Sequence, residues 1–220
     1  MDVLWQPDLF SGRGEMTVDA EFRTGRRTAL DAGSWVEVFP GWLAGANELF
    51  QCLAEAVPWQ EHHRWLFRQR FLEPRLTAEY HQLADAPHPA LAAAGDALSA
   101  HYGVRYDNLW LNLYRSGEDS TSWHRDRFSC RRPECIVPVL TLGATRRFLL
   151  KPRAGGPSIA FHPSAGDLVV MGGRCQDEWV HSVPKAPGTL GARISVNFQS
   201  SEQARRPRPD EATSSRGRGV

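Results

Sequence analysis

The chain has 220 residues, of which 41% are hydrophobic, and this composition excludes an intrinsically disordered protein. The length allows one substantial core, so we expect a single domain with extensions. Because 26 Lys and Arg residues balance 25 Asp and Glu residues to a net charge of +1, the total charge neither indicates nor excludes an anionic partner.

The N-terminus and the cysteines bear on the cellular compartment. The start of the chain lacks the basic residues and apolar run of a secretory signal, and no apolar stretch approaches the roughly 18 residues that span a bilayer. Cys130 and Cys135 could form half of a zinc site, but free thiols in a reducing compartment are the favoured interpretation of all four cysteines. We therefore expect a cytoplasmic protein that is monomeric and makes no membrane contact.

The first half of the chain predicts one short strand and two helices. Residues 1–30 are polar and mixed, and we interpret them as a loose N-terminal extension. Residues 35–39 predict a strand, and apolar residues at helical spacing predict a helix over 44–57. A second, alanine-rich helix opens at His88-Pro89 and runs to about His101, just before a glycine that favours a helix end.

After these helices, short apolar runs alternate with turn residues, a texture typical of an all-β sandwich or jelly roll. Seven such runs lie at 108–114, 135–142, 147–151, 158–161, 167–171, 178–183 and 193–198. The expected fold class is therefore mainly β with flanking helices (α+β), a jelly roll braced from outside by the two N-terminal helices. The domain spans 31–200. The tail at 201–220 is rich in Arg, Pro, Ser and Gly and is expected to be disordered.

A His-x-Asp pair, His124 and Asp126, indicates a metal site. In an extended chain, residues two apart point to the same face, so the imidazole and the carboxylate can reach one ion. His181, at the end of a distant strand-like run, is the best candidate for a third ligand. Two imidazoles and one carboxylate leave part of an octahedral ion open, which suits Fe(II), although zinc accepts the same ligands. A surface loop histidine is the alternative interpretation of His124.

The last predicted strand alternates cleanly between apolar and polar residues. Its polar side chains are Arg193, Ser195, Asn197 and Gln199. A guanidinium group grips a carboxylate with two hydrogen bonds, and Arg193 lies twelve residues after His181, within reach of the same pocket. Asn112 and Tyr114 lie two apart on an earlier strand and could donate hydrogen bonds to the same anion. The alternative is that this polar face simply meets water.

Taken together, these motifs resemble the AlkB family of iron- and 2-oxoglutarate-dependent dioxygenases. The ordered set is Asn112-x-Tyr114, His124-x-Asp126, His181 before Val183-Pro184-Lys185, and Arg193 in a strand, with a PRLTAxY stretch at 74–80. The resemblance covers roughly residues 35 to 200 and implies a double-stranded β-helix with Fe(II) at its mouth, using O2 and 2-oxoglutarate. It also implies that Asn112, Tyr114, Ser195 and Gln199 contact 2-oxoglutarate, and that Arg193 pairs with its distal carboxylate.

The resemblance also assigns residues to the substrate. It implies that 65–82 forms a lid over the substrate base, with Trp65 and Phe67 available for stacking and with Arg75 and Tyr80 in the lid. Arg127 follows the metal aspartate closely and is a further candidate for substrate contact. Arginine clusters near 64–75, 125–132 and 146–153 indicate a rim that contacts phosphates, with solvated surface as the alternative.

The implied reaction is oxidative demethylation of alkylated DNA or RNA, which releases formaldehyde and succinate. Two departures from the family pattern concern the ligands. A second arginine is usual six residues after the first, where this chain has Gln199, and several repair members carry an acidic residue where this chain has Arg127-Phe128. The alternatives are the same chemistry on a modified RNA, a protein or a small molecule, and a nucleic-acid-binding jelly roll without turnover.

Overall fold

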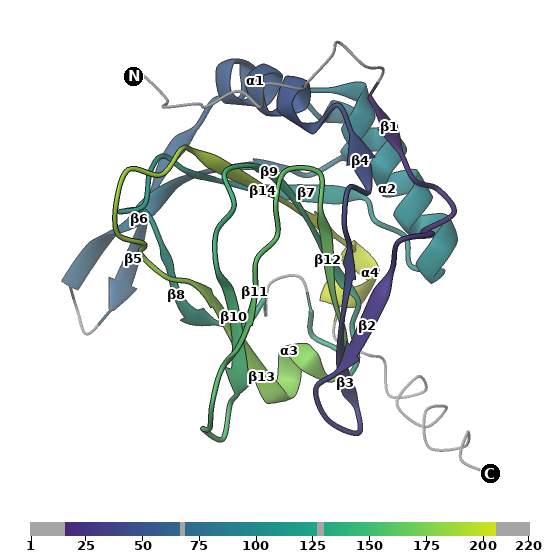
Figure 1. Cartoon of the computed structure of the whole chain (residues 1–220), viewed down its shortest axis with the longest axis vertical. Helices are drawn as coiled ribbons and strands as arrows, with labels where there is room; N and C mark the ends of the chain where they lie inside the picture. Colours follow the sequence, from purple (N-terminus) through teal and green to yellow (C-terminus); the bar gives the residue numbers. More distant parts are fainter. Residues whose placement is uncertain (1–15, 67–68, 127–129, 206–220) are drawn as a thin grey trace.

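Two antiparallel β-sheets face each other and form the body of the protein (Figure 1). The computed structural model describes residues 16–66, 69–126 and 130–205. The larger sheet runs in the order β2 (Arg26–Ala29), β3 (Ser34–Phe39), β12 (Leu168–Gly173), β9 (Val137–Gly143), β14 (Arg193–Gln199), β7 (Asn108–Tyr114), β6 (Gln69–Tyr80) and β5 (Gln60–Leu66). The smaller runs β11 (Ile159–Phe161), β10 (Phe148–Pro152), β13 (Trp179–Val183) and β8 (Thr121–His124). A further pair joins β1 (Thr17–Val18) to β4 (Leu43–Ala44).

Two helices cover the outer face of the larger sheet, as the sequence predicts (Figure 1). These are α1 (Ala46–Ala56) and α2 (Pro89–Tyr102). Helix α2 begins at a proline whose missing N–H costs nothing there, and the preceding His88 side chain accepts a hydrogen bond from the Ala90 N–H. It ends at Gly103, whose φ of 64° is a left-handed conformation that glycine adopts without strain.

Alternation along β7 and β14 gives the larger sheet an apolar outer face and a polar inner face. The two strands pair antiparallel, with Asn112 opposite Ser195 and Tyr114 opposite Arg193. The outward side chains pack against α1 and α2 in the main core, and they are Leu109, Leu111, Leu113, Ile194, Val196 and Phe198. The inward side chains face the smaller sheet. The expected jelly roll, or double-stranded β-helix, with two bracing helices is confirmed.

Both ends of the described chain are more ordered than predicted. Residues 16–30 are not loose, because β1 and β2 pair with other strands and Phe22 is buried against Phe39 and Trp42. Residues 201–205 are not a disordered tail, because α4 (Ser201–Ala204) buries Gln203, whose amide bonds the backbone of Ile136. Residues 1–15 and 206–220 lie outside the described residues.

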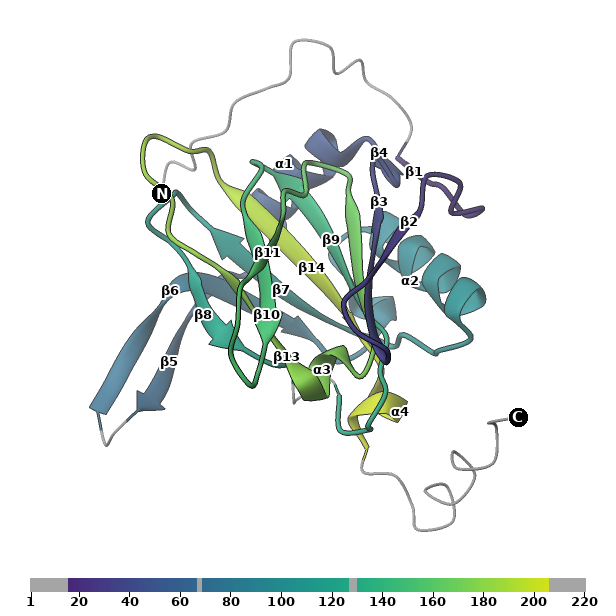
Figure 2. The same ribbon diagram turned by 60° about the horizontal axis from the view of Figure 1, so that its bottom comes forward.

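Two further expectations concern the cysteines and the hairpin at 65–82. Cys130 and Cys135 form a disulfide rather than free thiols or half of a zinc site, while Cys52 and Cys175 are free. The predicted lid falls on a long hairpin of β5 and β6 that projects from the edge of the larger sheet, followed by a short 3-10 turn at Leu83–Asp85 (Figure 2). Among the described residues, no helix is long and apolar enough to cross a membrane.

Arg146 is a structural residue rather than part of a phosphate-contacting rim. Its side chain is 2% exposed and donates to the backbone carbonyls of Ser116 and Asp119 before β8, at 2.8 Å each. It also donates to the carbonyl of Pro184, directly after β13, at 2.8 Å. One buried guanidinium therefore joins the loops that flank two strands of the smaller sheet.

We predict that Arg146→Ala lowers the free energy of unfolding by about 2–4 kcal/mol, because it leaves several buried carbonyls without a donor. The neighbouring Arg147 is exposed and provides a matched control. Arg147→Ala should change the free energy of unfolding by less than about 0.5 kcal/mol in the same urea titration. Equal effects of the two substitutions would contradict the structural role of Arg146.

Candidate metal centre and anion pocket

His124, Asp126 and His181 come together at one end of the cavity between the two sheets. One potential ligand atom from each residue lies within 4.8 Å of those of the other two. The Asp126 Oδ1 atom is 3.6 Å from His124 Nε2, and its Oδ2 atom is 3.4 Å from His181 Nε2. The two imidazole rings are 4.2 Å apart between centroids. The three residues that the sequence predicts as ligands are therefore placed to share one ion.

Pairing between β8 and β13 brings the two histidines together. His124 lies directly opposite His181, and Thr121 lies opposite Val183. Three residue steps on β8 therefore match two on β13, which is a β-bulge with one extra residue on β8. The bulge allows both Thr121 and His124 to face inward, although plain alternation would place them on opposite faces. Bulges beside active sites commonly redirect side chains in this way.

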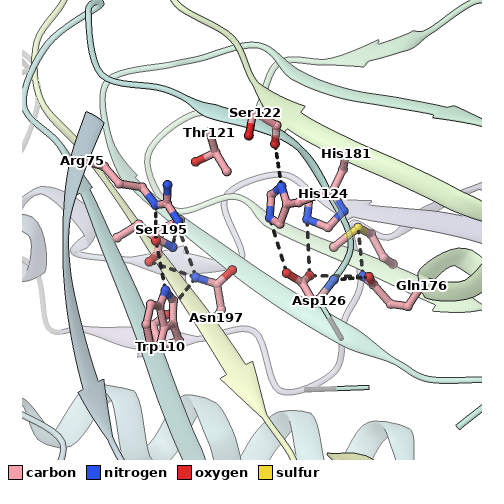
Figure 3. A network of polar contacts seen from close by, with 12 residues as sticks. Arg75, Trp110, Thr121, Ser122, His124, Asp126, Gln176, His181, Ser195 and Asn197 are labelled. Carbon is pink, nitrogen blue, oxygen red and sulfur yellow. Dashed lines mark hydrogen bonds and ion pairs between the residues drawn. The ribbon is translucent and has the colours of Figure 1, made fainter. Parts of the chain in front are cut away.

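Asp126 lies beyond the end of β8, so strand alternation does not set its position. Instead, the backbone N–H of Asp126 donates to Gln176 Oε1 at 2.8 Å, and Gln176 Nε2 donates to Asp126 Oδ2 at 3.2 Å (Figure 3). Gln176 is buried in the short helix α3 (Cys175–Glu178), directly before the strand that carries His181. The sequence offers no signal for this role, because the contact joins residues 50 positions apart.

The protonation states of Asp126 and His181 suit metal binding. Burial raises the pKa of Asp126, but the charges and hydrogen bonds of His181 and His124 outweigh burial and hold it far below its usual range. Burial lowers the pKa of His181, and the nearby Asp126 charge does not fully offset this. Burial also lowers the pKa of His124, but the hydrogen bond and charge of Asp126 reverse the shift and raise it. Asp126 is thus a carboxylate and His181 a neutral imidazole at neutral pH.

The donor set fits Fe(II). His124 Nδ1 donates to the Ser122 carbonyl at 2.8 Å, so its Nε2 atom carries the lone pair that can bind an ion. Two imidazole nitrogens and one carboxylate match the facial arrangement of non-heme Fe(II) oxygenases, which keep further positions open for other ligands. The chain supplies these three ligands from β8, the loop after it, and β13.

A second feature of the cavity is a buried arginine suited to an anion. Arg193 is 2% exposed, and its Nη2 donates to Thr141 Oγ1 at 3.1 Å. Within the described part of the chain, its Nε and Nη1 atoms have no hydrogen-bond partner. Burial lowers its pKa, as does the neighbouring charge of Arg146. A buried cation with two unused donors is costly unless an anion binds there, so the site fits a carboxylate ligand.

Asn112 is held in one orientation beside this arginine. Its Oδ1 atom accepts hydrogen bonds from Arg75 Nε at 2.9 Å and from Trp110 Nε1 at 3.0 Å. Its Nδ2 group donates to Ser195 Oγ at 3.1 Å. Because both donors hold the carbonyl oxygen, the amide N–H groups face the remainder of the polar cluster. The sequence could have indicated Trp110, since alternation places it on the same face as Asn112 and Tyr114.

Tyr114 also lies within this cluster, between the anion pocket and the metal ligands. Its hydroxyl is 2.7 Å from Thr121 Oγ1, on the strand that carries His124. Its ring lies 5.3 Å from the guanidinium carbon of Arg193. The structure therefore brings the predicted contacts Asn112, Tyr114, Arg193 and Ser195 together on one inner face.

Other predicted site residues have different outcomes. Gln199 lies at the end of β14, and among the described residues no hydrogen bond links its side chain to this cluster. Tyr80 is partly buried and packs against the main core, on the opposite face of β6 from Arg75, and its contact with the substrate stays a prediction. Trp65 belongs to β5, but its side chain lies outside what the structure describes. Phe67 and Arg127 lie outside the described residues.

We predict that Gln176→Leu weakens Fe(II) binding about 10–100-fold, because the carboxylate of Asp126 loses the amide that orients it. Gln203→Leu is the matched control. Gln203 is also a buried glutamine, but its side chain bonds the backbone of Ile136 and not a metal ligand. Anaerobic Fe(II) titrations should separate the two variants. Unchanged Fe(II) affinity in Gln176→Leu would contradict the orienting role.

Comparisons with known proteins agree with this site. A sequence model described as the 2OG-Fe(II) oxygenase superfamily matches residues 36–199. The chain is similar to "Alpha-ketoglutarate-dependent dioxygenase alkB homolog 3" of Bos taurus, at 28% identity over 73% of this chain and 64% of that protein. The same protein of Homo sapiens is 27% identical over 76% of this chain and 66% of its own length. This chain thus spans somewhat less than two thirds of these relatives.

Two further comparisons extend the likeness. "DNA oxidative demethylase ALKBH2" of Arabidopsis thaliana is 26% identical over 68% of this chain and 60% of that protein. The solved structure titled "The structure of OsALKBH1" matches with a TM-score of 0.52 and 12% identity, over 80% of this chain and 100% of that one, which is a likeness of fold. The resemblance to AlkB proteins is confirmed. The chain belongs to the 2OG-Fe(II) oxygenase superfamily.

Proposed function

We propose that this protein removes methyl groups from alkylated bases in DNA or RNA by oxidation that depends on Fe(II) and 2-oxoglutarate. One observation carries the proposal: a His-Asp-His cluster and a buried arginine with two unused donors lie in the same cavity. The names of the similar proteins, which include a DNA oxidative demethylase, support a nucleic-acid substrate. The proposed products are formaldehyde, succinate and the unmodified base.

The residues of the cavity divide between the metal and the cosubstrate. His124, Asp126 and His181 would hold Fe(II), which supplies the oxidation of the methyl group by O2 coupled to decarboxylation of 2-oxoglutarate. Arg193 pairs with the distal carboxylate of 2-oxoglutarate through its unused nitrogens, and Tyr114 borders that contact. The buried setting strengthens this ion pair and excludes water from it.

Arg75 supplies the positive charge that Gln199 lacks. Its guanidinium donates to Asn112 Oδ1 and lies 2.7 Å from Glu73 Oε2, and its charge opposes protonation of His124. Its guanidinium thus contacts the polar cluster around Asn112 and is close enough to His124 for their charges to interact. We assign Arg75 to the end of 2-oxoglutarate nearer the metal, directly or through the oriented amide of Asn112.

The remaining assignments stay predictions. Trp65, Phe67 and Arg127 are proposed to contact the substrate, and Gln199 to contribute a hydrogen bond without charge. A cytoplasmic location and a monomeric state are also proposed. The disulfide between Cys130 and Cys135 counts against the cytoplasmic location, because thiols in a reducing cytoplasm reduce most disulfides.

A panel of oligonucleotides that carry 1-methyladenine or 3-methylcytosine tests the proposed function. With Fe(II), 2-oxoglutarate and O2, we expect one formaldehyde and one succinate for each restored base, measured by mass spectrometry. Asp126→Ala should abolish turnover while circular dichroism shows an intact fold. Succinate without a change in any base would redirect the search to another substrate, and the absence of succinate under all conditions would favour a binding protein without turnover.

We predict that Arg75→Gln raises the KM for 2-oxoglutarate about tenfold or more, because a charge-assisted hydrogen bond contributes roughly 1.5–3 kcal/mol. Arg75→Lys should restore part of the affinity, since it keeps the charge but not the forked geometry. The measurement compares KM values for 2-oxoglutarate and for the methylated oligonucleotide. An effect on the oligonucleotide alone would return Arg75 to the substrate lid.

A further inference from the structure

A groove runs along the outside of the protein beside the metal ligands. Its volume is about 450 Å³, and it lies between β6, β8 and the segment after β13. It adjoins the inner cavity, because Arg75 and Thr121, which contact Asn112 and Tyr114 there, also line the groove. The lining residues used below are Leu72, Pro74, Ser120, Ser122, Trp123 and Lys185.

Trp123 is the main aromatic surface in this groove. It directly precedes His124 on β8, within the bulged segment, and it is 38% exposed. Leu72, which also lines the groove, is 48% exposed. Among the described residues, only three large hydrophobic side chains have such exposure, and the third, Ile159, does not line the groove. Exposed apolar side chains that gather in a polar-rimmed groove mark a binding surface.

One of the two lysines of the chain lines this groove, and the other contacts its tryptophan. Of the 26 Lys and Arg residues, only Lys151 and Lys185 are lysines. Lys151 Nζ lies 4.3 Å from the centroid of the Trp123 ring, and Lys185 lines the groove. Arginines such as Arg146 fill sites of fixed geometry, whereas a lysine is a flexible point charge that follows phosphate oxygens without a set direction.

Lys185 can be released to a ligand. It pairs with Glu118 at 3.1 Å, but both side chains are mostly exposed, and exposed ion pairs are weak. A phosphate group can therefore replace the Glu118 carboxylate at little cost. Serine hydroxyls at Ser120 and Ser122 add hydrogen-bonding groups along the same wall.

We propose that this groove binds the nucleotide that flanks the target base in single-stranded nucleic acid. The flanking base stacks on Trp123, and the ammonium groups of Lys151 and Lys185 contact the neighbouring phosphates. An aromatic platform between cations suits an unpaired base, whose face is free, rather than a base within a duplex. The inference rests on the proposed function. In this arrangement the bound nucleic acid passes from Trp123 directly to the metal ligand His124.

Binding of a labelled, methylated single-stranded oligonucleotide to the Fe(II)-loaded protein without O2 tests this inference. Trp123→Ala should raise the Kd about tenfold or more, the loss expected for one stacked base, while Trp123→Phe stays near the wild-type value. Ile159→Ala is the control, an exposed apolar residue away from the groove. An unchanged Kd in Trp123→Ala, or a duplex bound more tightly than the single strand, would overturn the proposal.

Chemical labelling of the two lysines tests the inference on the wild-type protein. An amine-reactive reagent should label Lys151 and Lys185 in the free protein, and the oligonucleotide should protect both from labelling. A plot of the logarithm of the binding constant against the logarithm of the salt concentration gives a further test. For the Lys151→Ala, Lys185→Ala double variant, the slope of this plot should become less negative by about 0.7 for each lost phosphate contact. Labelling that continues unchanged in the complex would overturn the proposal.

The outcomes also separate this inference from the proposed function. If the wild-type protein neither binds nor demethylates any oligonucleotide, the proposed function fails and this inference fails with it. If the wild-type protein demethylates the oligonucleotide, but Trp123→Ala binds it equally well and the lysines are unprotected, only the inference fails.

Discussion

The pairing of β8 with β13 is the interaction on which the site depends. It sets His124 opposite His181, and its bulge turns one more residue of β8 into the cavity than alternation allows. Asp126 completes the cluster only because Gln176, directly before β13, holds both its backbone and its carboxylate. Arg146 then joins the loop before β8 to the segment after β13, at the Thr121–Val183 end of this strand pair. A shift of one residue in this register would move His124 out of line with His181.

The two faces of the larger sheet differ in character: one packs in the hydrophobic core and the other is polar. Its outer face packs Leu111, Val196 and their neighbours against two helices. The inner face instead buries Asn112 and Arg193, and the guanidinium keeps two nitrogens without partners among the described residues. Burying such a cation opposes folding unless an anion pairs with it, so this face fits a carboxylate ligand. Strand alternation thus gives one sheet an apolar packing face and a buried polar face.

Sequence patterns predicted the parts of this structure that depend on periodicity. The two helices, β7, β14 and the polar face of β14 followed from apolar spacing, and the ligand cluster followed from several motifs in a fixed order. The roles of Gln176 and Arg146 could not be predicted, because each depends on contacts between segments that only the fold brings together. Alternation from Arg75 would have placed Tyr80 on the core side of β6, where its side chain packs.

We propose that His124, Asp126 and His181 would hold Fe(II) together with 2-oxoglutarate, and that Arg193 would anchor the far carboxylate of 2-oxoglutarate. The most direct test is an anaerobic titration of 2-oxoglutarate into the Fe(II)-loaded protein, followed by the visible absorption of the metal chelate. We predict an absorption change that saturates at one equivalent, requires Asp126 and shifts to higher 2-oxoglutarate concentration in Arg193→Gln. No absorption change, or one that persists unaltered in Asp126→Ala, would contradict this account.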